Sequence, residues 1–247
     1  MFINLDLNTL LIMLFAISAG GFLKGVISFG FPLIALPILS LALPPKSAIF
    51  LLFFSLIFVN IREIKIKNRE NYKRIAPLAL GIFLGIIVGS IIFHKVESEF
   101  ISKMIGGTIV LSALINYFGF KINSSLLLNT SFSLLYGLFA GVIGGMTTIV
   151  GPLIVIYLVS LNLKKQIFSE LVSLSVFSCL APLYGIFFIY QEVTINDFLV
   201  SAAFAIPAIL MQILGFKIRT IIPQNTFKNV TLFILIIIGL IVLYKNW

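Results

Sequence analysis

The chain of 247 residues is 60% hydrophobic and only 10% charged, and its mean hydropathy is +1.19. About a quarter of the residues in a soluble domain are charged, so this composition excludes a secreted domain, a cytosolic enzyme and a nucleic-acid-binding protein. It predicts a polytopic membrane protein. The formal net charge of +9 comes mostly from basic residues in short polar stretches, where they report orientation in the membrane rather than a nucleic-acid partner. The single cysteine, Cys179, excludes an intramolecular disulfide.

Apolar runs follow one another along the chain, with no linker long enough to divide residues 1–247 into two domains. We expect an all-α membrane protein whose helices are formed by residues 8–43, 47–60, 75–93, 101–120, 126–161, 169–190, 198–215 and 230–244. The runs 8–43 and 126–161 would each measure about 54 Å as a helix, against a hydrocarbon core of about 30 Å. Both should therefore be interrupted near the middle, as a hairpin or a pair of short spans.

Residues that break or turn helices occur in both long runs. They are Gly20, Gly21, Gly25, Gly30 and Pro32 in the first run, and Gly141, Gly144, Gly145, Gly151 and Pro152 in the second. At an offset of 120 residues, Gly21 and Gly25 match Gly141 and Gly145, and the Pro-Leu-Ile triplet at 32–34 matches that at 152–154. Glycine-rich apolar sequence matches itself easily, but the break, the proline and the order of the later spans all agree. The sequence therefore predicts internal repeats at 8–120 and 126–245, each a broken segment followed by three spans.

Basic residues test whether the two repeats are parallel or inverted. If each broken segment returns to its starting side, one side of the membrane holds 12 basic residues and the other holds 4. The 12 are Arg62, Lys65, Lys67, Arg69, Lys73, Arg74, Lys121, Lys164, Lys165, Lys217, Arg219 and Lys228, and the 4 are Lys46, Lys95, Lys103 and Lys245. A single crossing by each segment would give 8 against 8. The positive-inside rule favours the first arrangement, which makes the repeats inverted (4+4 segments) and puts both termini outside the cytoplasm.

The two breaks are expected to meet inside the membrane and to form a site for an anion. Helices that start near Pro32 and Pro152 would point free N–H groups and a partial positive charge into one cavity. Ser28, Thr147 and Thr148 can donate hydroxyl hydrogen bonds, while Gly30 and Gly151 allow the backbone to come close to the substrate.

Lys24 is the only basic residue deep inside an apolar run. Two interpretations fit it: a counter-charge for an anionic substrate, or a side chain that snorkels to the interface. Glu170 begins an apolar run, and it fits both a proton carrier for coupling and a helix-start acid favoured by the helix dipole. The charged stretch from Arg62 to Arg74 is interpreted as a solvated cytoplasmic loop.

Nucleotide-binding, zinc-protease and Cys-x-x-Cys motifs are all absent from the sequence. Their absence argues against an ATP-driven pump and against most intramembrane hydrolases. We expect no metal and no cofactor.

The stretches AGGFLKGVISFGFPLIALPIL (19–39) and GLFAGVIGGMTTIVGPLIVIYL (137–158) resemble the two motifs of the TauE/SafE family of sulfite-exporter-like permeases. The resemblance covers essentially the whole chain. It implies transport of sulfur-containing anions without ATP, and it marks eight positions: Gly25, Ser28, Gly30, Pro32, Gly145, Thr148, Gly151 and Pro152. Phe31, where small residues are common in the family, and the stretch Met146–Thr148 depart from its pattern and leave the substrate open.

Together these observations predict a transporter of the cytoplasmic membrane, not an enzyme, that moves small sulfur-containing anions such as sulfite, thiosulfate or organosulfonates by alternating access. Coupling to a proton or ion gradient and assembly into a homo-oligomer are compatible with the sequence. The partners expected are the anion and the lipid bilayer, without nucleic acid. An anion channel with the same pore-lining breaks and a non-transporting subunit or intramembrane enzyme remain alternatives.

Overall fold

The computed structural model describes residues 6–64, 69–118, 122–127, 129–161, 163, 165–191 and 193–219, and all regular secondary structure in these ranges is α-helical. The helices are α1 (Leu7–Ile27), α2 (Phe31–Leu39), α3 (Pro45–Ile61), α4 (Arg69–Lys95), α5 (Ser98–Phe118), α6 (Ser124–Leu127), α7 (Thr130–Thr147), α8 (Gly151–Val159), α9 (Lys165–Tyr190) and α10 (Ile195–Ile218). The predicted all-α class is confirmed. The predicted span 230–244 lies outside the described residues.

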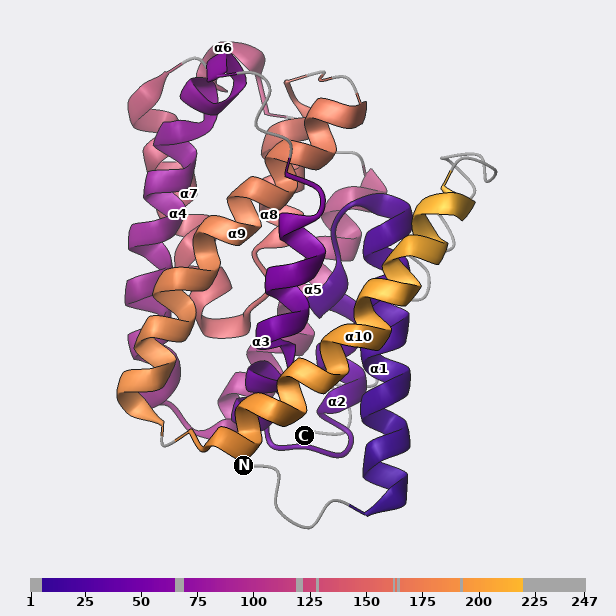
Figure 1. Cartoon of the computed structure of the whole chain (residues 1–247). Coiled ribbons are helices and arrows are strands. Elements are labelled where there is room, and N and C mark those ends of the chain that lie inside the picture. Colours follow the sequence, from indigo (N-terminus) through magenta and orange to yellow (C-terminus); the bar gives the residue numbers. More distant parts are fainter. Residues whose placement is uncertain are drawn as a thin grey trace.

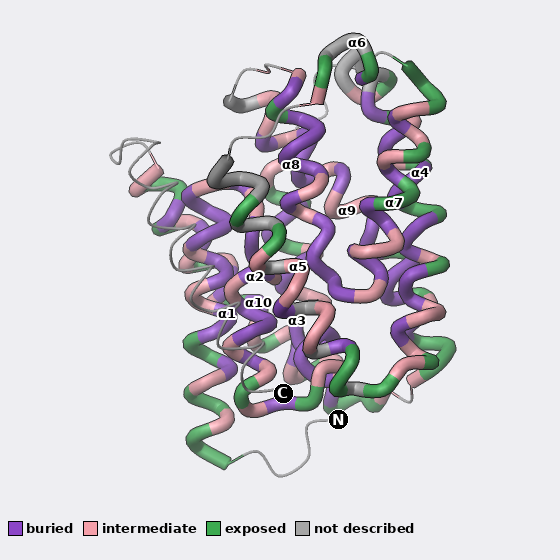
Figure 2. The backbone as a smooth tube through the Cα atoms, turned by 180° about the vertical axis from the view of Figure 1, so that it is seen from behind, coloured by how far each residue is buried: buried purple, intermediate pink, exposed green. Residues whose placement is uncertain are grey.

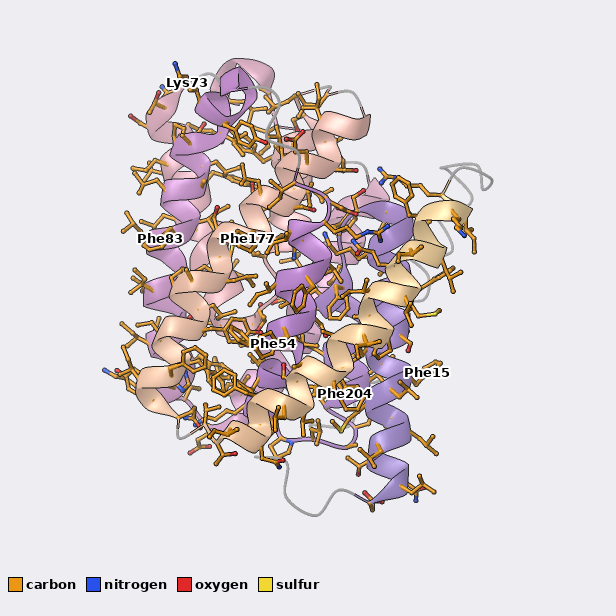
Figure 3. The ribbon with its side chains drawn as sticks, in the orientation of Figure 1. Phe15, Phe54, Lys73, Phe83, Phe177 and Phe204 are labelled. Atoms are coloured by element: carbon orange, nitrogen blue, oxygen red, sulfur yellow. The ribbon has the colours of Figure 1, made fainter. Side chains whose placement is uncertain are left out.

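Five of the described helices are long and apolar enough to cross a membrane: α1, α4, α7, α9 and α10. Their outer faces carry large apolar side chains such as Phe15, which is 65% exposed, and Phe83, and these two point away from the bundle on opposite sides (Figure 3). The buried residues lie where helices face one another, as Figure 2 shows. An apolar exterior of this kind is stable in lipid and not in water, so the chain is an integral membrane protein.

Each of the two long apolar runs forms one helix of membrane-spanning length followed by a helix of nine residues. The first break lies at Ser28–Gly30, between α1 and α2, and the second lies at Thr148–Val150, between α7 and α8. A nine-residue helix is about 13.5 Å long and covers about half of the hydrocarbon core. The predicted interruptions are therefore confirmed, but they come late in each run, and neither run is a pair of short spans.

Most of the glycines that we interpreted as helix breakers lie inside continuous helices, and that part of the prediction is wrong. A methyl group added at Gly21 in α1 would come within 2.4 Å of the carbonyl oxygen of Ala208 in α10. At Gly85 in α4 it would come within 2.2 Å of the carbonyl oxygen of Leu138 in α7. Lipid provides no hydrophobic force between helices, so small residues that let two backbones touch are what hold such pairs together.

The helices within each glycine-packed pair are parallel. Gly81, Gly85 and Gly89 of α4 face Leu134, Leu138 and Val142 of α7 in rising order, and Gly21 and Gly25 of α1 face Ala208 and Gln212 of α10 in the same way. In Figure 1 the α1–α10 pair runs towards the top of the view, whereas the α4–α7 pair runs towards the bottom.

Helices α3 and α9 cross between the two pairs and form the centre of the bundle (Figure 1). The hydroxyl of Tyr184 in α9 donates to the carbonyl of Ile49 in α3 at 3.0 Å, and the rings of Phe50 and Phe187 stack at 5.6 Å between centroids. The ends of α3 and α10 and the starts of α4 and α9 all lie towards the upper end of Figure 1, and Lys73 marks the start of α4 in Figure 3.

Candidate functional site

The first break ends α1 and starts α2 with backbone that has few hydrogen-bond partners. Ser28 takes a left-handed conformation (φ 73°), and its N–H bonds the carbonyl of Lys24 at 2.8 Å. Gly30 is also left-handed (φ 89°), and Pro32 lies in the first turn of α2, which has no side-chain cap. No described residue accepts a hydrogen bond from the N–H groups of Phe31 or Leu33. The start of α2 therefore presents free donors and the positive end of its dipole.

The second break repeats this design between α7 and α8. Thr148 is left-handed (φ 63°), and its N–H bonds the carbonyl of Gly144 at 2.6 Å. The α8 helix starts at Gly151 with Pro152 in its first turn, again without a side-chain cap. The hydroxyl of Thr148 is buried without a partner among the described residues, and a methyl group at Gly151 would meet nothing within 4 Å. The predicted helix starts at the two prolines are thus confirmed.

Lys24 lies in the last turn of α1 and is only 2% exposed. Its Nζ donates to the carbonyl oxygen of Ser28 at 3.0 Å and to the Oγ of Ser173 in α9 at 3.1 Å. It also forms an ion pair with Oε2 of Glu63 at 3.5 Å. The snorkelling interpretation of Lys24 is therefore wrong, because the ammonium group is held inside the protein.

Glu63 follows the end of α3, and its side chain is only 10% exposed. Besides Lys24, its Oε2 accepts from the Oγ of Ser173 at 2.7 Å, and its Oε1 accepts from Nε2 of Gln212 in α10 at 3.3 Å. The interpretation of this stretch as a solvated loop is wrong at Glu63, which turns back into the bundle and pairs with a buried cation.

Arg219 supplies a second cation from the end of α10. Its Nη2 donates to the Oγ of Ser169 in α9 at 2.8 Å, and that Oγ lies 2.6 Å from the Oγ of Ser28. Partial burial lowers the pKa of Arg219 and the nearby Glu63 opposes that shift, but a guanidinium stays charged at neutral pH.

These residues form one network, which we call the ionic cluster: Lys24, Ser28, Glu63, Ser169, Ser173, Gln212 and Arg219. It joins the first break to the end of α3, the start of α9 and the end of α10. With two cations and one carboxylate, its formal charge is +1 when Glu63 is ionised. Of these residues, Lys24 and Ser28 are predicted from the sequence to bind the substrate.

The remaining predicted residues lie elsewhere. Gly25 and Gly145 lie in the helix contacts, where added methyl groups would come within 2.3 Å of the Gln212 carbonyl oxygen and 2.6 Å of the Ile86 carbonyl oxygen. The hydroxyl of Thr147 donates to the Ile143 carbonyl at 2.8 Å and accepts from the N–H of Ile149. Among the described residues, no hydrogen bond joins the two breaks, so their meeting in one cavity stays a prediction.

Glu170, the predicted coupling residue, accepts a hydrogen bond from the hydroxyl of Tyr72 at the start of α4. Burial and this carboxylate raise the pKa of Tyr72 to about 12, so its hydroxyl remains a donor at physiological pH. In the part of the chain that the structure describes, no hydrogen bond links Glu170 to the ionic cluster. Within the same residues, no group of His, Cys, Asp and Glu is arranged to hold a metal ion.

Span-length helices, two broken segments with free helix starts and a buried ionic cluster together define an integral membrane protein with discontinuous helices, an organisation typical of secondary transporters. The chain matches the family model of the sulfite exporter TauE/SafE over residues 12–242, and it belongs to this family. Neither a curated protein nor a solved structure matches it. The family is one of membrane transporters, in keeping with a protein that is not an enzyme.

Proposed function

We propose that this protein is a secondary transporter that carries small sulfur-containing anions, such as sulfite, thiosulfate or organosulfonates, across the cytoplasmic membrane by alternating access. The observation that carries the proposal is the ionic cluster, because a buried lysine and a partly buried arginine beside three serine hydroxyls form a setting that favours an oxyanion. Membership of the sulfite exporter family gives the class of anion.

The donors of the cluster suit a small oxyanion. Lys24 and Arg219 can each make charge-assisted hydrogen bonds, which are about twice as strong as neutral ones. Ser28 joins these cations to the first break, where the start of α2 adds free N–H groups. An anion bound at this point would contact α1, α2, α9 and α10, so its binding can couple these four helices.

Alternating access is supported by the correspondence between the two halves of the chain. Gly21 packs on Ala208 as Gly141 packs on Ile82, and Gly25 packs on Gln212 as Gly145 packs on Ile86. These contacts match at offsets of 120 and 126 residues, and the two helix pairs run in opposite directions (Figure 1). We propose that residues 8–120 and 126–245 are inverted repeats, which can exchange their conformations to open the site to either side.

Orientation follows from the distribution of charge. The end of the bundle that holds the ends of α3 and α10 is the end to which the sequence assigns 12 basic residues. We propose that it faces the cytoplasm, with both chain termini on the opposite side. The ionic cluster would then lie towards the cytoplasmic end of the transport path.

The test is anion flux in proteoliposomes, compared between the wild type and Lys24→Gln. Loss of a charge-assisted hydrogen bond costs about 1.5–3 kcal/mol, so thiosulfate should bind about 10- to 150-fold more weakly. Lys103→Gln is the control, because Lys103 is 41% exposed and pairs with Glu99 on the surface of α5. The double variant Lys24→Gln/Glu63→Gln avoids leaving an unpaired buried carboxylate, which by itself destabilises a fold.

Counterflow separates a transporter from a channel with the same lining. A transporter preloaded with unlabelled thiosulfate should accumulate labelled thiosulfate transiently, whereas a channel should not. Absence of any anion flux from the purified wild-type protein would refute the proposed function.

A further inference from the structure

The two cations of the ionic cluster share a single carboxylate. Both oxygens of Glu63 already have donors: Oε2 accepts from Lys24 and Ser173, and Oε1 accepts from Gln212. The Glu63 carboxylate thus pairs with the Lys24 ammonium group in the way that an anionic substrate would. A substrate that binds Lys24 must either displace this carboxylate or bind beside it.

Charge decides between these two possibilities. Two anions beside one buried ammonium repel each other strongly, because opposite and like charges interact more strongly in a low dielectric than in water. Protonation of Glu63 removes that repulsion and raises the formal charge of the cluster from +1 to +2, which suits a doubly charged anion. Anion binding should therefore favour the protonated carboxyl, and protonation should favour anion binding.

Two cations face Glu63, and they come from two different helices. Among the described residues, the charged groups facing Glu63 are Lys24 from α1 and Arg219 from α10, while Ser173 of α9 and Gln212 are neutral. Glu170, an acid on α9, accepts a hydrogen bond from Tyr72 instead. The buried Oε1 of Gln212 has no donor in the described part of the chain, so rotation of this amide would offer an acceptor to a protonated Glu63.

We propose that Glu63 is the proton-binding carboxylate of this transporter and that it competes with the anion for Lys24, so that each anion binds together with a proton. This inference rests on the proposed function and assigns the coupling ion and its residue. Glu63, rather than Glu170, is the coupling group, because only Glu63 is bonded to the cation that binds the substrate.

The first test measures thiosulfate binding to the purified protein by calorimetry from about pH 5.5 to about pH 8, where thiosulfate keeps both charges and only the protein titrates. Affinity should fall as the pH rises, by up to about tenfold per pH unit where Glu63 is ionised before binding. Titrations in two buffers of different ionisation enthalpy should report the uptake of about one proton for each anion. If the wild-type protein takes up no proton when it binds thiosulfate, the proposal is wrong.

The second test uses Glu63→Gln, which resembles the protonated side chain. Its thiosulfate affinity should be nearly independent of pH and should match the wild-type value at acid pH. In proteoliposomes, the variant should lose accumulation of thiosulfate driven by a pH gradient. The control Glu99→Gln, at a side chain that is 63% exposed, should retain the wild-type pH dependence and accumulation.

Two outcomes would refute the role of Glu63 while leaving the transport function intact. In one, Glu63→Gln keeps the wild-type pH dependence and gradient-driven accumulation. In the other, the folded variant binds no thiosulfate at any pH, which would make Glu63 a residue that positions Lys24 rather than a competitor for it. Failure of the proposed function itself is distinguishable, because the wild-type protein would then carry no anion.

Discussion

A single methyl group in the contact between α4 and α7 should destabilise the protein. In Gly85→Ala, the new Cβ would lie 2.2 Å from the Leu138 carbonyl oxygen and 2.8 Å from the Val142 backbone nitrogen. Both are backbone atoms, so no flexible side chain can move aside. The helices would have to separate by about 0.8 Å to bring the shorter contact to 3.0 Å, and overpacking of this kind costs about 1–3 kcal/mol.

The matched control is Gly185→Ala in α9, where an added Cβ meets nothing within 4 Å. Alanine is a better helix former than glycine by about 1 kcal/mol, so this variant should be as stable as the wild type or more stable. Both changes add the same atoms to the interior of a helix. The difference between them therefore isolates the cost of the helix contact.

The assay is thermal unfolding of the purified protein in detergent. At about 2–4 °C per kcal/mol, Gly85→Ala should melt several degrees below Gly185→Ala. Gly85 is not in the ionic cluster, so anion affinity of the fraction that remains folded should not change. Equal melting temperatures for the two variants would show that the helices do not touch through this glycine, and would refute the account of how the pairs pack.

Two further predictions concern the break and the orientation. Gly30→Ala forces a left-handed conformation on a residue with a Cβ, at a cost of about 1–2 kcal/mol, so it should lower both the melting temperature and anion uptake. The control Gly107→Ala, which has open space around the added methyl group, should change neither. Anion uptake at the wild-type level in Gly30→Ala would contradict a role for this turn. In a Cys179→Ser background, cysteines at Lys73 and Glu97 should be labelled by a membrane-impermeant reagent from opposite sides of the membrane, and labelling of both from one side would contradict the topology.

The breaks could be predicted from sequence because their chemistry is local. Proline at the second position of α2 and of α8 favours a helix start whatever surrounds it, because its missing N–H would have no partner there. The positions near Pro32 and Pro152 were therefore predicted correctly, and the family motifs fall on the same residues.

The role of the other glycines could not be predicted in this way. Gly21 and Gly85 are compatible with a break or with a close helix contact, and the choice depends on which helix lies opposite. The partner of Gly21 is Ala208, which lies far away in the sequence. Only the tertiary structure brings these two backbones together.

Glu63 and Arg219 were missed because they lie among charged residues at the ends of apolar runs, where the sequence pattern is that of a solvated loop. Lys24 was noticed because its neighbours are apolar. The signal that could have found Glu63 is the need of a buried lysine for an opposite charge, but several acids in the sequence could have met that need.

The sequence by itself determined that the protein lies in a membrane, that it is helical and that two helices break, because hydropathy, proline and glycine act through solvent and local backbone geometry. The tertiary structure decided which glycines join helices and which carboxylate pairs with Lys24. The physical reason is distance: close packing and charge pairing act over a few ångströms between residues that may stand anywhere in the chain, and only the folded arrangement fixes which of them meet.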